Sequence, residues 1–337
     1  MLDISAETLP AALYRDPTFY ETERQRIFAR SWHLVAHEAQ FAERGSSLAV
    51  TIASFPLLLV RGDDGRIRAF HNVCRHRAGP LAPDGQGTCV GMLVCRYHGW
   101  RYALDGRLAA ARDFGPAEGF DVREYGLFDL GCESWRGFVF INIDAAAPSL
   151  ASAIAPLAER ARDMPLESFR PVHRTTHEVR CNWKTYVENY LEGYHVPIVH
   201  PALNVAVDAS RYEVELRGEI VFHHAPPRAG APMSGLWAWM WPCLGVNVYP
   251  NGLMMERMWP IDHARLDYLY FFPEDLPEAE RDAAIASSEV TAVEDIAITE
   301  AVQRNLNAGI YEKGRLSPKH EAAVALFQRL VTRAMQA

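Results

Sequence analysis

Short apolar runs separated by turn residues occupy the chain between about residues 47 and 144. Two of these runs are SLAVTIASFPLLLVRG and RGFVFINID, and the stretches Asp63-Asp64-Gly65 and Asp105-Gly106 are typical turn sequences. Runs of this kind, rich in β-branched and aromatic residues and bounded by Gly and Asp, favour strands over helices. The pattern therefore predicts a compact all-β domain in this part of the chain.

Helical and strand patterns alternate in the rest of the chain. Residues 5–31 carry mixed charges on one side and apolar side chains on the other, which favours a helix. Residues 145–169 form a Pro- and Ala-rich connection with a helical stretch, and residues 278–337 have the spacing and composition of long helices. Strands are expected at residues 173–181, 212–224, 236–250, 253–261 and 264–273.

These patterns predict an α+β protein with two main domains. We expect residues 1–40 to form an N-terminal helical segment that packs on the second domain. The all-β domain is expected at residues 41–145, and an antiparallel sheet with helices at residues 146–337.

Composition narrows the functional classes. The 337 residues are 49% hydrophobic and 23% charged, with a formal net charge of -8 and no basic run, so disorder, nucleic-acid binding and attachment to an anionic membrane are not expected. The start of the chain lacks the pattern of a signal peptide, so we expect a cytoplasmic protein with a small-molecule partner. The stretch from Ala229 to Met255 has no charged residue, but its prolines and asparagines favour buried strands over a membrane span.

Two short Cys/His pairs lie in the β domain. Cys74 and His76 form the first pair, and Cys95 and His98 form the second after 18 intervening residues between His76 and Cys95. Pairs of this kind in loops can converge on one metal, and a structural zinc site with two Cys and two His is one interpretation. In a second alternative, Cys89 or Cys132 replaces one of the four ligands.

A second group of possible ligands follows Asn182. Asn182 is a good N-cap, and the helix that it opens is expected to end at Pro197. Glu192 and His195 are three residues apart and would share a face of this helix, and the chain can fold His200 back towards them. Two histidines and a carboxylate make the facial triad of non-heme Fe(II) oxygenases, although two unconnected histidines would explain the spacing alone.

The surrounding residues resemble one known family. HNVCRHRAGP and LVCRYHGWRYALDG resemble the Rieske iron-sulfur motif, and NWKTYVENYLEGYHVPIVH resembles the iron-binding signature of Rieske non-heme iron oxygenase α subunits. The resemblance runs nearly from end to end of the chain. It implies a Rieske domain followed by a helix-grip-like catalytic domain. It also implies one [2Fe-2S] cluster held by Cys74, His76, Cys95 and His98, and one Fe(II) held by His195, His200 and Asp295. Glu294 is the alternative third ligand of the Fe(II).

The resemblance also implies an electron path and partners. In the family a carboxylate carries electrons from the Rieske histidine of a neighbouring subunit to the iron, and by position this is Glu192, between His98 of the next chain and His195. Asn189 belongs to the same signature and is a further candidate catalytic residue. A closed path between chains needs at least a homotrimer with C3 symmetry, or a multiple of it. A separate flavin and iron-sulfur reductase would supply electrons from NAD(P)H, and O2 would be the co-substrate.

The substrate class rests on weaker signals. Most of the family has Asp at the position of Glu192, and Glu there, with the run around residues 302–318, resembles the choline, glycine betaine and carnitine monooxygenases. Such an enzyme would hydroxylate or N-dealkylate a quaternary ammonium or similar small substrate. Alternating tryptophans on one strand face, together with nearby tyrosines, could form a cation–π pocket, although such stripes are more often core. The candidates are Trp237, Trp239, Trp241, Tyr190, Tyr194 and Tyr249.

Two other functions remain open at this point. An aromatic-acid ring hydroxylase or O-demethylase of the same family would need a cation near the pocket, for which Arg228 and Arg257 are candidates. A Rieske electron carrier without oxygenase activity would explain residues 47–144 but would leave the residues of the second metal site as a coincidence.

Overall fold

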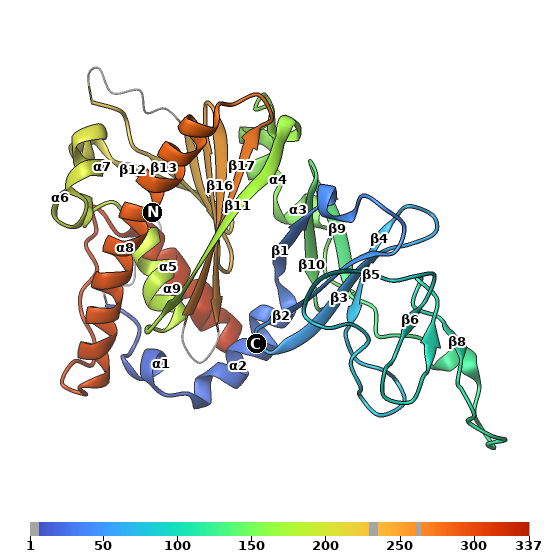
Figure 1. Ribbon diagram of the computed structural model, residues 1–337. Helices are drawn as coiled ribbons and strands as arrows, with labels where there is room; N and C mark the ends of the chain where they lie inside the picture. Colours follow the sequence, from blue (N-terminus) through green and yellow to red (C-terminus); the bar gives the residue numbers. More distant parts are fainter. Residues whose placement is uncertain (1–6, 229–234, 261–263, 337) are drawn as a thin grey trace. The chain divides into compact units, whose positions relative to one another are not determined.

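A computed structural model describes residues 7–228, 235–260 and 264–336 (Figure 1). The chain divides into two compact units, one made of Phe28–Leu150 and one made of Met1–Ile27 with Ala151–Ala337. We call them the β unit and the sheet–helix unit. The boundaries were expected after residues 40 and 145, but they lie after residues 27 and 150. The first one differs because residues 28–40 include β1 (Trp32–His37), which pairs with β10 (Phe138–Asn142).

The β unit contains three small sheets, as the alternating runs of short apolar segments predicted. Their strand orders are β1-β10-β9, β4-β3-β2-β5 and β6-β7-β8. Ala53 and Ser54 join β2 to β3 with φ of 46° and 65°, the left-handed conformation that two-residue hairpin turns require. The other elements are η1 (Phe28–Arg30), η2 (Glu38–Phe41), β2 (Ser46–Ile52), β3 (Phe55–Arg61), β4 (Ile67–His71), β5 (Gly85–Thr88), β6 (Leu93–Val94), β7 (Arg101–Tyr102), β8 (Leu108–Ala110), η3 (Val122–Glu124) and β9 (Gly131–Trp135).

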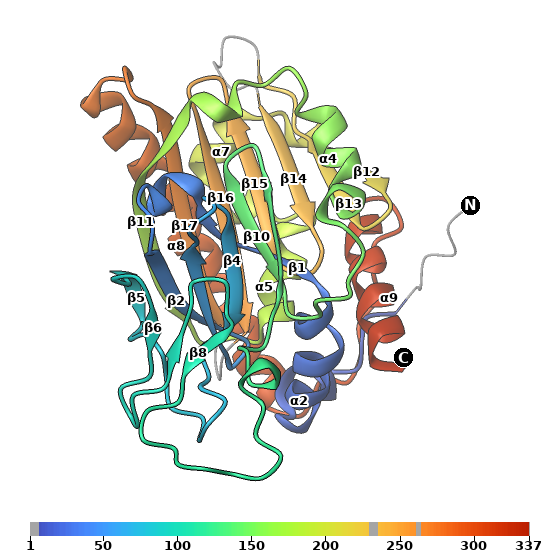
Figure 2. The same cartoon turned by 90° about the vertical axis from the view of Figure 1, so that its right-hand side faces the viewer.

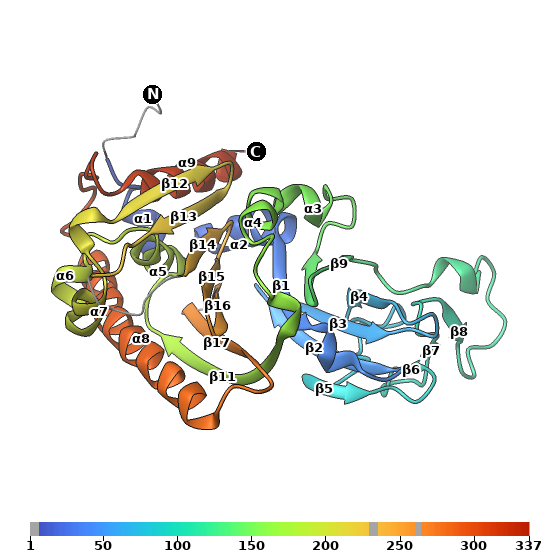
Figure 3. The same ribbon diagram turned by 90° about the horizontal axis from the view of Figure 1, so that it is seen from above.

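One seven-stranded antiparallel sheet organises the sheet–helix unit, with the order β11-β17-β16-β15-β14-β13-β12. Strands β14 to β17 lie side by side in Figure 2, and Figure 3 shows the sheet curving around helix α5. All five expected strand segments are confirmed. The strands are β11 (Phe169–Val179), β12 (Glu213–Arg217), β13 (Ile220–His224), β14 (Leu236–Met240), β15 (Leu244–Tyr249), β16 (Gly252–Pro260) and β17 (Ala264–Pro273).

The uncharged stretch is also confirmed as buried strands, since β14, β15 and the first part of β16 lie in it. Its residues 229–234 lie outside the described part of the chain. Among the described residues, no helix is long and apolar enough to cross a membrane.

The helices of this unit depart from the sequence patterns in two places. The expected N-terminal helix is interrupted at Pro17, and the helix that opens at Asn182 ends at Tyr190, well before Pro197. The helices are α1 (Ala12–Arg15), α2 (Thr18–Arg26), α3 (Leu150–Ala153), α4 (Ala155–Arg160), η4 (Leu166–Ser168), α5 (Trp183–Tyr190), α6 (Val196–Val199), α7 (Pro201–Ala206), η5 (Ala209–Arg211), α8 (Glu278–Asn307) and α9 (Ala322–Gln336).

Strand register decides which side chains of the sheet face α5. A Cβ atom built on Gly245 would lie 2.9 Å from the ring of Tyr190, so the face that carries Gly245 is the one against this helix. Paired residues of neighbouring antiparallel strands point to the same face. One row on this face therefore contains Trp239, Gly245, Glu256 and Tyr268, and the next contains His223, Trp237, Asn247, Met254 and Tyr270.

Candidate active site

Two loops of the β unit carry the Cys/His pairs and share one pattern of backbone hydrogen bonds. In each loop the Cys amide donates to the carbonyl five residues on, and the Cys carbonyl accepts from the amide four residues on, at 2.9–3.0 Å. Matched loops can present two thiols and two imidazoles from equivalent positions, as a cluster with two Cys and two His ligands requires. The partners are Gly79 and Ala78 for Cys74, and Trp100 and Gly99 for Cys95.

The two imidazoles of these loops lie against each other. The ring centroids of His76 and His98 are 4.5 Å apart, and His76 stacks on Trp100 at 5.0 Å. The Nδ1 atoms of both histidines are buried and have no hydrogen-bond partner. A buried nitrogen atom without a hydrogen-bond partner is energetically costly. Two such atoms at one place thus indicate metal ligands. The donor set therefore fits a [2Fe-2S] cluster.

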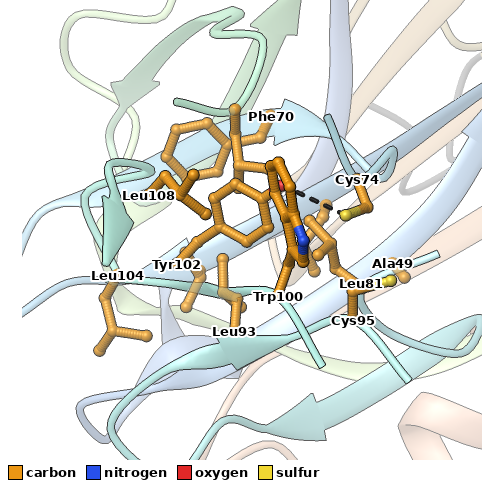
Figure 4. Packing of buried hydrophobic residues seen from close by; sticks show 13 residues of the cluster. Ala49, Phe70, Cys74, Leu81, Leu93, Cys95, Trp100, Tyr102, Leu104 and Leu108 are labelled. Carbon is orange, nitrogen blue, oxygen red and sulfur yellow. Dashed lines mark hydrogen bonds between the residues drawn. The ribbon is translucent and has the colours of Figure 1, made fainter. Parts of the chain in front are cut away.

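Cys74 and Cys95 are both buried beside the aromatic core of this unit (Figure 4). The Tyr102 hydroxyl donates to the sulfur of Cys74 at 3.2 Å and accepts from the amide of Arg75 at 2.9 Å. Hydrogen bonds to ligand sulfurs tune the reduction potential of such clusters. A Cβ atom on Gly79 would lie 2.9 Å from the sulfur of Cys95, so the loop leaves no room for a larger residue.

The alternative cysteines lie elsewhere in the β unit. The sulfur of Cys89 is 3.7 Å from the hydroxyl of Ser47, and Cys132 lies on β9 opposite Ile141. Neither forms a matched Cys/His loop, so the structure favours the four residues first expected.

In the sheet–helix unit, three possible ligand atoms converge at one point. His200 Nε2 lies 3.2 Å from His195 Nε2 and 3.0 Å from the Oδ1 atom of Asp295, and His195 Nε2 lies 3.6 Å from the same oxygen. Three ligands at right angles, each about 2.1 Å from one metal ion, would be about 3.0 Å apart. The residues present therefore fit a mononuclear metal site with one open face.

Carboxylates behind the two histidines orient their rings. His195 Nδ1 donates to Glu192 at 2.6 Å, and His200 Nδ1 donates to Glu294 at 2.7 Å. With each Nδ1 atom held in this way, both Nε2 atoms face the oxygen of Asp295. This is how ligand atoms are arranged around a metal ion. Glu294 bonds to Nδ1 of His200, while the oxygen that faces both Nε2 atoms belongs to Asp295, so the geometry favours Asp295 over Glu294 as the third ligand.

The path of the chain around His195 differs from the expected helix. Leu191 caps α5, and Glu192 lies in the turn that follows, where its carboxylate accepts the amides of Tyr194 and His195. Glu192 therefore shapes the turn as well as orienting the imidazole. A Cβ atom on Gly193 would lie 2.6 Å from the ring of Tyr212, so this turn also depends on a glycine.

Asp295 comes from the middle of α8, and Asn189 of α5 donates to its Oδ1 atom at 2.6 Å. A cavity of about 190 Å³ opens beside the triad, smaller than the roughly 300–1,000 Å³ of drug-sized sites. The cavity is lined by aromatic, apolar and a few polar side chains from α5 to α8, among them Tyr190, Tyr212, His223, Trp237, Asn247, Tyr249, Met254, Glu256, Tyr268 and Ser288.

Two family models match the chain. The Rieske [2Fe-2S] domain model matches residues 31–125, and the model described as "Ring hydroxylating alpha subunit (catalytic domain)" matches residues 166–227 and 215–337. The chain belongs to the Rieske oxygenase α subunits. Its expected fold class, an N-terminal Rieske domain followed by a domain with an antiparallel sheet, is confirmed.

Relatives within this family are named for quaternary ammonium substrates. The carnitine monooxygenase oxygenase subunit of Escherichia coli K12 is 33% identical over 332 residues, which cover 92% of this chain and 87% of the relative. Choline monooxygenase of Beta vulgaris is 29% identical over 328 residues, 92% of this chain and 73% of that protein. The crystal structure of the quaternary ammonium monooxygenase CntA with L-carnitine has a TM-score of 0.86 at 30% identity, with 98% of this chain and 96% of that one covered.

This Rieske oxygenase subunit brings only some of the expected aromatic residues to its cavity. Trp237, Tyr190 and Tyr249 line it, but Trp239 and Trp241 do not, because both pack against Phe327 of α9. A common strand face was correctly expected for Trp237 and Trp239, but the cavity meets only one end of that face. The expectation of a three-tryptophan cage is therefore wrong.

Tyr194 also lies outside the cavity. Its side chain is 59% exposed and stacks on His320 with the centroids 4.5 Å apart. The two arginines proposed as anchors for a carboxylate substrate lie elsewhere as well. Arg228 donates to the Asn204 and Val207 carbonyls, and Arg257 points to the opposite face of β16 from Glu256, where it pairs with Asp267 at 2.9 Å.

Several cavity residues were not identified from the sequence. Glu256 and His223 are the most informative, because both are polar and buried at 3% and 5% exposure. A signal for Glu256 exists, since it is the first charged residue after the uncharged stretch and sits within an apolar strand. His223 gives no such signal, because His224 follows it and the sequence does not tell which of the two faces inwards.

Proposed function

We propose that this Rieske oxygenase subunit is the terminal component of a monooxygenase that hydroxylates or N-dealkylates a quaternary ammonium or similar small cation. The observation that carries the proposal is the kind of ionisable side chain that lines the cavity, which includes acids but never Lys or Arg among the described lining residues. Apart from Glu192 and Asp295 at the metal site, Glu256 is the acidic residue of the lining. The aromatic faces of Tyr190, Trp237 and Tyr249 suit a positive headgroup, at about 0.5–2 kcal/mol per contact.

The metal-site residues have distinct tasks in this proposal. Cys74, His76, Cys95 and His98 would hold the cluster, and His195, His200 and Asp295 would hold Fe(II). The bound iron supplies the binding and reduction of dioxygen, while the cluster supplies electrons singly. Around the second site the chain fixes both imidazoles through Glu192 and Glu294 and leaves one face open to the cavity.

Electron supply completes the proposal. One turnover consumes O2, two electrons and two protons, and yields hydroxylated substrate and water; a separate reductase would provide the electrons from NAD(P)H. Glu192, bound to His195 at 2.6 Å and with 11% of its side chain exposed, would receive them from His98 of a neighbouring subunit. This route needs a closed ring of subunits, and a C3 trimer is the smallest such assembly. We propose that the assembly is cytoplasmic.

The proposal is tested by coupled oxygen consumption with NADH and a surrogate reductase. Choline, glycine betaine, carnitine and stachydrine would be compared with a set of aromatic acids. We expect an aldehyde or a demethylated amine from a quaternary ammonium compound and no product from the acids. Turnover of aromatic acids alone would overturn the substrate class, and would favour the ring hydroxylase or O-demethylase.

A matched variant separates an oxygenase from an electron carrier. His195→Ala should abolish product while the visible absorption of the cluster remains unchanged, because the two metal sites lie in different units. Iron analysis should give three irons per wild-type chain and two for the variant. Two irons in the wild type, or continued turnover by the variant, would contradict the assignment of the second site.

A further inference from the structure

Glu256 is a buried acid whose bonding is incomplete. It lies in the middle of β16, it is 3% exposed, and its buried Oε1 atom has no hydrogen-bond partner among the described residues. The hydroxyls of Tyr268 and Tyr186 act on this carboxyl group and bond to each other at 2.6 Å. A carboxylate oxygen left in this state is costly unless something in the cavity pairs with it.

Among the described residues, none of the groups around Glu256 is a Lys or Arg. Across the sheet its neighbours in the row are Gly245 and Tyr268, and from α5 the ring of Tyr190 fills the space that Gly245 leaves open. The other acidic group that acts on it is Asp295. The described groups that face this carboxyl from the sheet and both helices are therefore tyrosines and one acid.

His223 lies on the same face of the sheet, on β13, and its hydrogen bonding is also incomplete. It is 5% exposed, and its Nδ1 atom lies 2.6 Å from the hydroxyl of Tyr212. Its Nε2 atom is buried without a partner. Because burial lowers the pKa of His223 to about 3, the ring is neutral near neutral pH.

The bond to Tyr212 decides which ring nitrogen of His223 carries the proton. The Tyr212 hydroxyl has no other acceptor among the described residues, so we assign its hydrogen to the bond with Nδ1 and the ring hydrogen to Nε2. The cavity thus has an unpaired acceptor on β16 and an unpaired donor on β13. The two strands are three spacings apart, about 14 Å between backbones, and both side chains point inwards.

We propose that Glu256 and His223 recognise the two ends of one substrate. Glu256 lies against the positive nitrogen, and the Nε2 hydrogen of His223 donates to an oxygen at the other end of a short chain. The substrate class is thereby narrowed to small cations that also carry a hydroxyl or carboxylate oxygen. This inference rests on the proposed function only in that the substrate is a cation.

The proposed recognition by Glu256 and His223 is tested by changing the ligand and the protein separately. Binding would be measured by calorimetry to the iron-loaded protein, without reductase and without oxygen, so that no turnover occurs. The probes are choline, ethyltrimethylammonium, which lacks its oxygen, and 3,3-dimethylbutan-1-ol, which lacks its charge. For the wild type we expect choline to bind more tightly than either analogue, by roughly 10- to 100-fold against the uncharged one.

The variants should each remove one preference. Glu256→Gln keeps the size of the side chain but not its charge, and should abolish most of the preference for choline over the uncharged alcohol. His223→Phe should abolish the preference for choline over ethyltrimethylammonium and leave the charge preference intact. His223→Gln, which retains an N–H donor, should recover part of the oxygen preference.

The outcomes separate this inference from the proposed function. If the wild type binds these cations and both variants keep the wild-type preferences, the pairing is wrong while the substrate class stands. If no cation of the screen binds the wild type, the proposed function fails as well. Unchanged cluster absorption and one mononuclear iron per chain in each variant would show that a lost preference does not come from misfolding.

Discussion

The carboxylate of Glu294, 2.7 Å from Nδ1, orients the His200 ring from the side opposite Asp295. Removing an acid that orients a metal-binding histidine typically lowers metal affinity about 10- to 100-fold. We therefore expect Glu294→Ala to lose mononuclear iron when iron is limiting while cluster absorption is unchanged, and Glu294→Gln to fall between it and the wild type. Glu280→Gln, on the exposed first turn of the same helix, is the control. Full iron occupancy in Glu294→Ala would contradict this role.

Glu256 should make the protein less stable as pH rises. Burial raises its pKa to about 8, and the described groups that act on it are Asp295 and five tyrosines, Tyr186, Tyr190, Tyr249, Tyr268 and Tyr270. Between the ordinary carboxyl pKa of 4.5 and about 8, the unfolded chain binds fewer protons than the folded one, so the free energy of unfolding falls with pH.

Glu256→Gln lacks this titration. In ligand-free protein its free energy of unfolding should exceed that of the wild type by a margin that grows from pH 5 to pH 8, by at most about 1.4 kcal/mol per pH unit. Urea unfolding at both pH values measures the margin. An equal margin at the two pH values would mean that Glu256 does not gain a proton in the empty cavity.

At the scale of elements, α5 is tied to α2 by a buried ion pair. Lys184 and Glu23 are 0% and 1% exposed, the ammonium group bonds to one carboxylate oxygen, and Trp183 Nε1 donates to the other at 2.8 Å. Breaking such a pair leaves an uncompensated buried charge, which costs about 3–5 kcal/mol. We expect this loss in Lys184→Met, measured by urea unfolding, and a partial recovery in the double variant Lys184→Met/Glu23→Gln.

A surface pair on the same helix is the control for this prediction. Arg24 and Glu21 lie 2.8 Å apart in α2, with 64% of the Glu21 side chain exposed. Exposed pairs contribute about 0–1 kcal/mol, so Glu21→Gln should change the unfolding midpoint little. Equal losses in the two helix variants would indicate a general loss of α2 packing instead of a buried charge.

An element could be predicted from the sequence where local residues determine its conformation and its ends. The strands are confirmed because alternation and turn residues are local signals. The helix end before Glu192 was not predicted, since Pro197 was taken as the breaker. In the structure the Glu192 carboxylate binds the amides of Tyr194 and His195 and bends the chain earlier. A side chain that bonds its own backbone after a turn has no signature in hydrophobic periodicity.

At the scale of the whole molecule, metal ligands were easier to predict than the cavity wall. Most of the ligands lie in short motifs, such as the one from Asn182 to His200, and a family resemblance supplies Asp295. The wall is assembled from separate strands through register, so Trp237 lines the cavity while Trp239 packs against α9. Glu256 and Arg257 are neighbours in sequence but point to opposite faces, and the sequence does not say which is inside.

The proposed electron path between subunits can be tested with mixed oligomers. A Cys95→Ser chain should lack the cluster, a His195→Ala chain should lack the mononuclear iron, and each alone should be inactive. If electrons cross from one chain to the next, co-expression in equal amounts should restore activity. Half of the chains retain the iron site and half of their neighbours retain a cluster, so about a quarter of wild-type activity is expected in a ring.

The control for this experiment is to mix the two variants after their oligomers have assembled. Separately purified variant oligomers that are mixed without subunit exchange should stay inactive, because no neighbouring pair contains both intact sites. Mixed oligomers that contain both iron sites by chemical and spectroscopic analysis but show no turnover would place the electron path within one chain. Glu192→Ala in the chain that keeps the iron should then abolish the restored activity while leaving the cluster spectrum unchanged, since only that chain's carboxylate contacts the acting His195.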